Sequence, residues 1–387
     1  MKPWDVIVIG AGAVGSAALR AASEAGARVL GVEQYTPANP RGSSHGHSRI
    51  FRHAYFEHPD YVPLLQHATA RLESLERETG SRLLHRCGML LMGAPGCPAV
   101  TGAIESARRW GLPLDALDAA GIRSRFPWFD VRPDTHGAFE ANAGIARPEA
   151  TVRAAIQFAL ARGAELRLRQ RVDAVVEDDA GVTVVMPSGT ERAAVVIIAA
   201  GPWASALMPE LRPSLRVTRV VQAWLEPRDG TDTSAMPCWL YDRGPGRRAI
   251  YGLAPDPMEA NPPHGPPSPS RYPKVGLHGS DVLVDPDRGA APVTTADTDA
   301  ILAEYGAIAP SLAGRIVESA TYLYTMSPDE HFILGPRPGC RRTFFAAGLS
   351  GHGFKLAPAL GDALADLALL GSTTLPVGFL SPKRFGV

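Results

Sequence analysis

Short apolar runs separated by a helical pattern open the chain. Residues 5–9 (Asp-Val-Ile-Val-Ile) are rich in β-branched side chains, which is typical of a buried strand. Residues 16–25 are rich in alanine and have helical spacing, and residues 28–33 form a second short apolar run. This order predicts a strand, a helix and a second strand, which make one β-α-β unit of about 30 residues.

The same patterns recur along the chain. Helices are predicted over 61–79 (ending at Gly80), 148–162, 294–302 and 357–370. Strands are predicted over 83–92, 172–177, 182–186, 195–199, 217–225, 249–253 and 343–347. Because Rossmann-like pieces lie at both ends and antiparallel-looking strands in the middle, we expect an α/β fold with two domains. A Rossmann-like nucleotide-binding domain (1–85, 146–215 and 320–387) receives an inserted α+β substrate domain (86–145 and 216–319) built on a mixed antiparallel sheet.

A glycine motif follows the first predicted strand. Gly10, Gly12 and Gly15 form G-x-G-x-x-G directly before the first helix. These glycines permit a tight turn, close approach to a pyrophosphate, and close packing of helix and strand, and the helix N-terminus offers free N–H groups to the phosphates. Glu33 ends the second strand, where a carboxylate can accept from a ribose hydroxyl. The motif predicts a bound dinucleotide but does not choose between FAD and NAD.

Composition narrows the possible partners. The 387 residues include 39 Lys or Arg and 39 Asp or Glu, so the formal net charge is zero and no basic field attracts nucleic acid or a membrane surface. No apolar run reaches the ~18 residues that cross a bilayer, and the N-terminus does not resemble a signal peptide. The four cysteines form no CxxC pair. We expect a cytoplasmic protein with free thiols that is a monomer or a small homo-oligomer.

The segment 43–53 is dense in Ser, His and Arg. Its histidines do not favour a metal site, because no helical i, i+4 pair is present and the neighbouring arginines would repel a cation. Arg49 and Arg52 are three residues apart and would share a face if the segment were helical. A guanidinium suits bidentate binding of a carboxylate, and a buried Arg52 requires a partner such as a substrate carboxylate or an internal acid. A solvated basic loop is the alternative.

Four stretches carry a resemblance to a known family. They are residues 10–15, 42–64 (especially Ser48 to Tyr55), 324–333 (Tyr-Thr, then Asp-Glu-His-Phe-Ile) and 346–355 (Ala-Ala-Gly-Leu-Ser-Gly-His-Gly-Phe-Lys), joined by Ala-Gly-Pro-Trp at 200–203. On these residues the chain resembles the monomeric sarcosine oxidase and N-methyl amino acid oxidase family, within the D-amino-acid-oxidase-like flavoproteins. The stretches are spread along nearly the full length.

The resemblance implies FAD as cofactor, oxidation of an amine, and reoxidation by O2 with release of hydrogen peroxide. It implies that Arg52 and Lys355 hold the substrate carboxylate, that Arg49 is a cation beside flavin and substrate, and that Lys274 activates O2. Tyr251, His278 and Tyr324 match positions that line the pocket, and His278 is a candidate general base. The segment 239–242 is also expected to line the pocket.

Motif and resemblance together predict a set of residues that bind the cofactor. They are Gly10, Gly12, Ala13, Val14, Gly15, Glu33, Gln34, Arg41, Ser43, Ser44, Ser48, Arg49, Val172, Gly201, Trp203, Gly348, Ser350, Gly351, His352, Gly353, Phe354 and Lys355.

Two departures from the family's pattern affect the expected chemistry. Tyr322 stands where the resembled oxidases have a cysteine bonded to the flavin, so we expect non-covalent FAD. Residues 254–273 contain eight prolines where the family has a short connection, which predicts an irregular loop, a reshaped pocket rim and a substrate other than sarcosine.

The expected substrate is therefore a small secondary, cyclic or N-methyl amino acid. A flavin dehydrogenase or tailoring enzyme of the same fold that acts on a natural-product amine is the nearest alternative. A non-catalytic nucleotide-binding protein and an NAD-dependent reductase are more remote.

Overall fold

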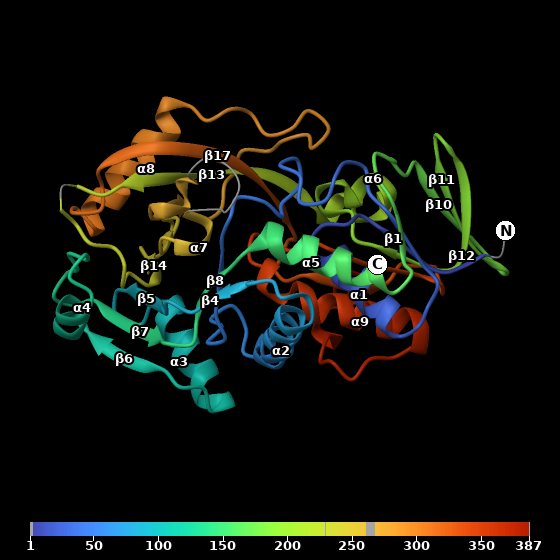
Figure 1. Cartoon of the computed structure of the whole chain (residues 1–387). Helices are drawn as coiled ribbons and strands as arrows, with labels where there is room; N and C mark the ends of the chain where they lie inside the picture. Colours follow the sequence, from blue (N-terminus) through green and yellow to red (C-terminus); the bar gives the residue numbers. More distant parts are fainter. Residues whose placement is uncertain (1–2, 229, 261–267, 387) are drawn as a thin grey trace.

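Two large β-sheets form the two halves of the molecule (Figure 1). The computed structural model describes residues 3–228, 230–260 and 268–386. Both termini lie in the half that contains the first sheet.

The first sheet has eight strands and combines the two ends of the chain. In it β1 (Trp4–Ile9) is parallel to both β2 (Val29–Val32) and β12 (Gly189–Ile198). The remaining strands are β9 (Glu165–Arg167), β10 (Ala174–Asp178), β11 (Gly181–Met186), β18 (Ile333–Pro336) and β19 (Thr343–Ala347). The order β10-β11-β12-β1-β2-β9, with β19 beside β12, confirms the Rossmann-like part of the predicted fold.

Helices cover one face of this sheet. They are α1 (Ala13–Glu24), α2 (Tyr61–Thr79), α5 (Pro148–Ala161) and α9 (Ala357–Leu370), and α1 contacts both α5 and α9. Val6 and Val8 of β1 share one buried cluster with Leu64 of α2 and Leu360 of α9. A left-handed glycine ends α2 at Gly80 (φ 69°), as its sequence predicts.

The second sheet also has eight strands and is mostly antiparallel. Its order is β17 (Arg315–Met326), β13 (Arg216–Glu226), β16 (Lys274–Leu277), β15 (Ile250–Leu253), β14 (Cys238–Asp242), β5 (Met89–Gly93), β7 (His136–Glu140) and β6 (Asp115–Asp118). Only the pair β14 and β5 is parallel among its described strands. The helices α3 (Pro98–Trp110), α4 (Ala119–Arg125) and α8 (Thr295–Ile308) lie in this half of the molecule. The mixed, largely antiparallel sheet expected in the middle of the chain is confirmed.

A small third sheet carries Arg49. It consists of β3 (Arg49–Phe51), β8 (Gly144–Ala146) and β4 (Leu84–His85), in the order β3-β8-β4. The helix considered for Arg49 and Arg52 is therefore wrong, because Arg49 lies in an extended strand and Arg52 follows its end.

The sequence patterns also missed or merged some elements. The single strand predicted at 83–92 is wrong: β4 and β5 belong to different sheets, and Gly88 (φ 85°) turns the chain between them. Short elements such as α4, β6 and β7 were not predicted, since few residues give a weak period. β17 crosses residue 320, which is one of the expected domain boundaries, and the division into domains stays a prediction. In the described part of the chain, no helix combines the length and apolar character that a membrane span needs.

Candidate active site

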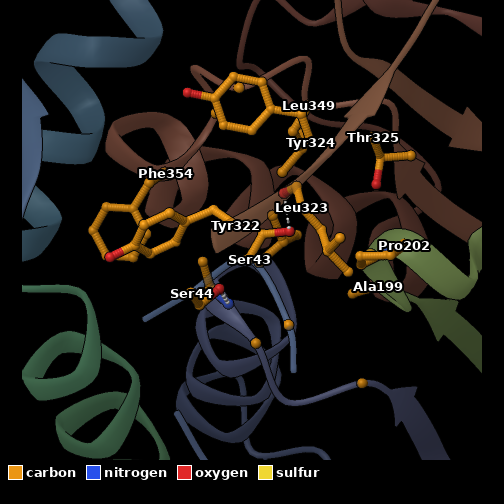
Figure 2. A pocket seen from close by; sticks show the side chains of 18 of the residues that line it. Ser43, Ser44, Ala199, Pro202, Tyr322, Leu323, Tyr324, Thr325, Leu349 and Phe354 are labelled. Atoms are coloured by element: carbon orange, nitrogen blue, oxygen red, sulfur yellow. Dashed lines mark hydrogen bonds between the residues drawn. The ribbon is translucent and has the colours of Figure 1, made fainter. Parts of the chain in front are cut away.

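One large cavity connects the glycine turn after β1 with the face of the second sheet. Figure 2 shows side chains of β17 (Tyr322 and Tyr324), of the N-terminal loop (Ser43 and Ser44) and of the C-terminal loop (Phe354) around it. The cavity therefore collects residues from both ends and the middle of the chain.

The glycine turn forms one end of the cavity. Gly10 has φ 89°, and a Cβ there would lie 2.4 Å from the Ala199 carbonyl oxygen, so a side chain is excluded. A Cβ on Gly15 would lie 1.8 Å from the Gly10 carbonyl oxygen, which explains the close packing of helix and turn. Gly15 thus acts by packing and does not itself line the cavity.

The same end has space and polar groups that fit a dinucleotide. The nearest protein atom to a Cβ on Gly12 is Ser44 Oγ at 3.4 Å, so packing within the protein does not demand this glycine, and the open space belongs to the cavity. Glu33 is buried and accepts hydrogen bonds from the backbone N–H of Ala11 (2.7 Å) and of Tyr35 (2.8 Å). The N-terminus of α1 begins at Ala13, beside this carboxylate. These residues fit the pyrophosphate and ribose of FAD.

Arg49 lies on the wall between the two ends of the cavity, and Lys274 lies behind this wall. Arg49 donates to the carbonyl oxygens of Ser48 (2.9 Å) and Ser43 (3.0 Å), and its guanidinium lies 5.1 Å from the centre of the Tyr322 ring. Lys274 Nζ donates to the carbonyl oxygens of Gly46 (2.9 Å) and Ser48 (2.7 Å). Burial, and then the charge of Arg49, lower the pKa of Lys274 well below its ordinary value. Lys274 lies behind Ser48 and does not line the cavity.

Tyr322 and His45 pack face to face beside this wall. Their rings stack at 4.6 Å, and neither the Tyr322 hydroxyl nor His45 Nε2 has a hydrogen-bond partner among the described residues. Burial and then Arg49 lower the pKa of His45 to about 4, so this histidine is neutral at pH 7. Two buried polar atoms without partners are costly unless a ligand satisfies them.

Two buried cations lie over one aromatic ring at the substrate end. The Arg52 guanidinium and Lys355 Nζ lie 4.2 Å and 5.4 Å from the centre of the Tyr55 ring, and both side chains are at least nine-tenths buried. Burial and then the charge of Arg52 lower the pKa of Lys355 to about 7. Lys355 Nζ donates to the His352 carbonyl oxygen at 2.8 Å.

Glu57 is the internal partner of Arg52. Arg52 Nη2 donates to both carboxylate oxygens of Glu57 at 2.7 Å, and Nη1 donates to the Ala54 carbonyl oxygen at 2.9 Å. Burial alone would raise the pKa of Glu57, but Arg52, His352 and Lys355 lower it to about 2, so the carboxylate is ionised. The sequence indicated an internal acid as one possible partner without locating it. The sequence feature that could have located this acid is the short spacing, because Glu57 lies five residues after Arg52.

Tyr55 and His352 connect the two loops that carry these cations. The Tyr55 hydroxyl lies 2.5 Å from His352 Nδ1, and His352 Nε2 lies 2.9 Å from the Glu330 carbonyl oxygen. Because a carbonyl only accepts, Nε2 carries the proton and Nδ1 accepts from the hydroxyl. Burial lowers the pKa of His352 to about 3. The hydrogen bond between Tyr55 and the neutral His352 ring therefore ties the loop of Arg52 to the loop of Lys355.

Tyr251, His278 and Tyr324 line the cavity on the face of the second sheet. Gln222 Nε2 donates to the Tyr251 hydroxyl at 2.5 Å, and sequence reasoning missed this glutamine. The His278 ring centre lies 6.3 Å from that of Tyr251 and 5.9 Å from that of Tyr324. Burial is the main cause that lowers the pKa of His278, so its ring is neutral near pH 7.

Most other predicted residues also line the cavity. They are Gly10, Gly12, Ala13, Val14, Glu33, Gln34, Ser43, Ser44, Ser48, Val172, Gly201, Trp203, Gly348, Gly351, His352, Gly353 and Phe354.

Arg41, Ser350 and the segment 239–242 differ from expectation. Arg41 is exposed beside the Tyr35 ring, and Ser350 is buried with its Oγ near Ser327, so neither lines the cavity. Of 239–242 only Leu240 lines it. Side chains alternate along a strand, and Trp239 instead stacks on Tyr305 in the core.

Comparisons with known proteins show the family of this chain. The model of the family "FAD dependent oxidoreductase" (DAO) matches residues 5–367. The chain is 36% identical to monomeric sarcosine oxidase of Streptomyces avermitilis, covering 99% of this chain and 98% of the relative. It is 34% identical to N-methyl-L-tryptophan oxidase of Citrobacter koseri, covering 94% of each chain.

Solved structures share the fold. The open form of NikD, described as an unusual amino acid oxidase essential for nikkomycin biosynthesis, has a TM-score of 0.83 at 25% identity and covers 99% of this chain and 98% of its own. L-Proline dehydrogenase from P. horikoshii has a TM-score of 0.83 at 20% identity, with the same coverage of 99% and 98%.

Proposed function

This chain belongs to the family of FAD-dependent oxidoreductases, and we propose that it oxidises a carboxylate-bearing secondary amine, an N-methyl or cyclic amino acid, to an imine with release of hydrogen peroxide. The observation that carries this proposal is the pair of buried cations, Arg52 and Lys355, over the Tyr55 ring at the cavity wall. Glu57 compensates one of these two positive charges, and the other is available to an anionic ligand. The names of two relatives, monomeric sarcosine oxidase and N-methyl-L-tryptophan oxidase, support a secondary amine as the substrate.

We propose that the substrate carboxylate binds between Arg52 and Lys355. Both carboxylate oxygens of Glu57 accept from Nη2 of Arg52. A substrate carboxylate therefore competes with Glu57 or binds the remaining donors, and the ammonium of Lys355 adds the second attraction. Fixing the carboxylate fixes the neighbouring C–H bond, so catalysis rests largely on orientation.

FAD, when bound, supplies the two-electron acceptor for this oxidation. We propose that the glycine turn, Glu33 and the loop 348–355 hold it, together with the other residues predicted for the cofactor. Tyr322 replaces the cysteine expected from the family pattern, and we propose non-covalent binding. The Tyr322 hydroxyl and His45 Nε2, which have no hydrogen-bond partner in the described part of the chain, support a polar contact with the flavin in place of a covalent bond.

The substrate must lose an ammonium proton before it is oxidised, because a protonated amine has no lone pair to donate. We propose that His278 accepts this proton, since burial keeps its ring neutral near pH 7 and it lines the cavity beside Tyr251 and Tyr324.

Arg49 and Lys274 are the proposed groups for the reaction with O2. Negative charge develops on O2 as it is reduced, and fixed donors in a dry site stabilise such charge. Two backbone carbonyls hold Lys274 Nζ in place, and Arg49 lies at the cavity surface nearby.

The side-chain end of the cavity is apolar. Ile50, Phe56, Met89, Leu240 and Leu253 line the cavity and belong to one apolar cluster. Of these, Phe56 has its ring centre 4.4 Å from the Arg52 guanidinium. This lining supports a substrate that carries an apolar side chain, which sarcosine lacks. The proline-rich stretch begins at residue 254, directly after Leu253, and also supports a reshaped rim. Its residues 261–267 lie outside the described part of the chain.

The first experiment is a substrate panel. N-methyl amino acids, cyclic imino acids and D-amino acids are tested for flavin bleaching without O2 and for peroxide release with O2. The proposal expects both signals from carboxylate-bearing secondary amines and neither from the matching decarboxylated amines. Bleaching without peroxide would instead support the dehydrogenase alternative.

Two variants test the binding of the substrate carboxylate, one at the proposed site and one as a control. Arg52→Ala should weaken the binding of carboxylates by at least tenfold. Arg219→Ala removes another buried arginine, which pairs with Asp297 and is not among the residues that line the cavity, and should lower stability without changing that affinity. Acid precipitation of the protein should leave the flavin in the supernatant; a yellow precipitate contradicts non-covalent binding.

A further inference from the structure

Cys87 and Cys238 bring their sulfur atoms to 3.9 Å from each other. Cys238 begins β14 and pairs with Met89 of β5 in a parallel register, and its N–H donates to the Gly88 carbonyl oxygen at 3.0 Å. The two backbones are thus already adjacent, and a disulfide bond of about 2.0 Å needs side-chain rotation rather than a shift of the strands. We infer that Cys87 and Cys238 form a reversible disulfide with hydrogen peroxide as the oxidant.

The two thiols differ in burial and in pKa, and this difference indicates which of them reacts first. Cys238 is fully buried, whereas Cys87 is half-buried. A hydrogen bond from Cys238 is the main cause that lowers the pKa of Cys87, and burial is the main cause that raises the pKa of Cys238. The thiolate is the reactive form of cysteine. Cys87 therefore reacts first, and Cys238 resolves the product.

The chemistry balances with peroxide alone. The Cys87 thiolate attacks one peroxide oxygen, so that an S–O bond forms, the O–O bond breaks and hydroxide leaves. The Cys238 sulfur then attacks the sulfenic sulfur, so that the S–S bond forms and the S–O bond breaks. The two thiol protons end in water. In sum, two thiols lose two electrons and one peroxide becomes two water molecules.

The pair also lies close to where peroxide would arise. Met89, which lies opposite Cys238, lines the cavity, and so does Leu240, two residues further along β14. On the neighbouring strand Leu253 lies opposite Lys274, and the N–H of Ala254 donates a hydrogen bond to the Cys238 sulfur. The supply of peroxide during turnover rests on the proposed function, whereas the pairing itself does not.

The test measures which thiols disappear. The holoenzyme is treated with added peroxide, alkylated, and digested without reductant for mass spectrometry. We expect a cross-linked peptide pair containing Cys87 and Cys238, lighter by two hydrogen atoms and separated again by dithiothreitol. Cys97 and Cys340 serve as internal controls and should stay alkylated. Cys87→Ser should abolish the cross-link, and so should Cys238→Ala.

A second measurement does not depend on any variant. A cross-link between residues 151 positions apart reduces the freedom of the unfolded chain. The oxidised wild type should therefore unfold at a higher denaturant concentration than the reduced protein. Oxidation of Cys87 to a sulfinic acid with Cys238 still free, or cross-links to Cys97 or Cys340 instead, overturns the inference.

In the third experiment the enzyme's own turnover is the source of peroxide. Substrate and O2 should produce the same cross-link, and catalase should prevent it. If added peroxide forms the cross-link and turnover does not, the thiol pair stands and the proposed peroxide-releasing function fails. If neither source forms it, the inference fails whatever the enzyme's activity.

Discussion

The ammonium of Lys355 should make carboxylate binding depend on pH in a range where an ordinary lysine stays charged. Burial and then the charge of Arg52 lower its pKa to about 7, against the attraction of Glu57. A bound carboxylate favours the charged form, so binding takes up a proton whenever the free protein has lost it. The affinity should therefore fall as the pH rises above 7.

The pKa sets the size of this effect. With a pKa of about 7, roughly half of the protein carries the ammonium at pH 7, about one-tenth at pH 8 and about one-hundredth at pH 9. If only the charged form binds well, the apparent Kd rises about fivefold from pH 7 to 8 and about tenfold from pH 8 to 9. His278 is already neutral in this range and the pKa of Tyr251 is raised, so neither of these two side chains changes its charge.

The assay is a titration of the holoenzyme with benzoate, followed by flavin absorbance at several pH values. Benzoate has no amine and stays ionised throughout, so the pH dependence comes from the protein, and the Lys355 variants assign it to Lys355. Lys355→Arg keeps a positive charge and should flatten the pH dependence, since a guanidinium does not lose its proton in this range. Lys355→Met should bind weakly at every pH.

Two results would refute the reasoning. The first is a wild-type Kd that does not change between pH 7 and 9. The second is a Lys355→Met protein that keeps the wild-type slope, because the titrating group would then lie elsewhere.

Three further changes test neighbouring parts of the site. Glu57→Gln removes the anion that competes for Arg52, and should tighten benzoate binding by about 1–2 kcal/mol at an effective dielectric constant near 20. Because the pKa of Glu57 is about 2 in place of 4.5, the same change should lower the free energy of unfolding by about 3 kcal/mol at neutral pH. This difference is complete above pH 4.5 and shrinks as the pH falls toward 2; a thermal midpoint difference that does not shrink contradicts it. Lys274→Met should slow flavin reoxidation by O2 about a hundredfold and flavin reduction far less in stopped-flow absorbance, and equal losses would remove its assigned role. Asp256→Asn leaves the buried Arg147 unpaired and should cost about 3–5 kcal/mol in urea unfolding, with a change below about 1 kcal/mol counting against a structural role for this pair.

Local spacing in the sequence was sufficient for the elements that depend on neighbours along the chain. The helices over 61–79 and 357–370 and the strand over 343–347 have the predicted ends. Helical period, flanking glycines and β-branched runs act over a few residues. The glycine motif was predicted for the same reason, and Gly15 packs against Gly10 within one β-α-β unit. The contact that excludes a side chain at Gly10 comes instead from Ala199, which is remote in the sequence.

The sequence also identified the cations of the site, because the stretches that carry Arg49, Arg52 and Lys355 match the family. Their surroundings depend on the tertiary structure. Glu57 pairs with Arg52, and Tyr55 holds Arg52 and Lys355 over one ring although the two lie about 300 positions apart in the sequence. No local sequence pattern can predict a contact between residues so far apart in the chain.

Pairing between remote strands decided the rest. The predicted strand over 83–92 divides between two sheets, only Leu240 of 239–242 lines the cavity, and Lys274 lies behind its wall. Which face of a strand is buried depends on its partner and register, and one residue of shift exchanges the two faces. The sequence thus determined the cofactor class and the charged groups, whereas the fold alone decided which of them touch, which are buried and how their pKa values shift.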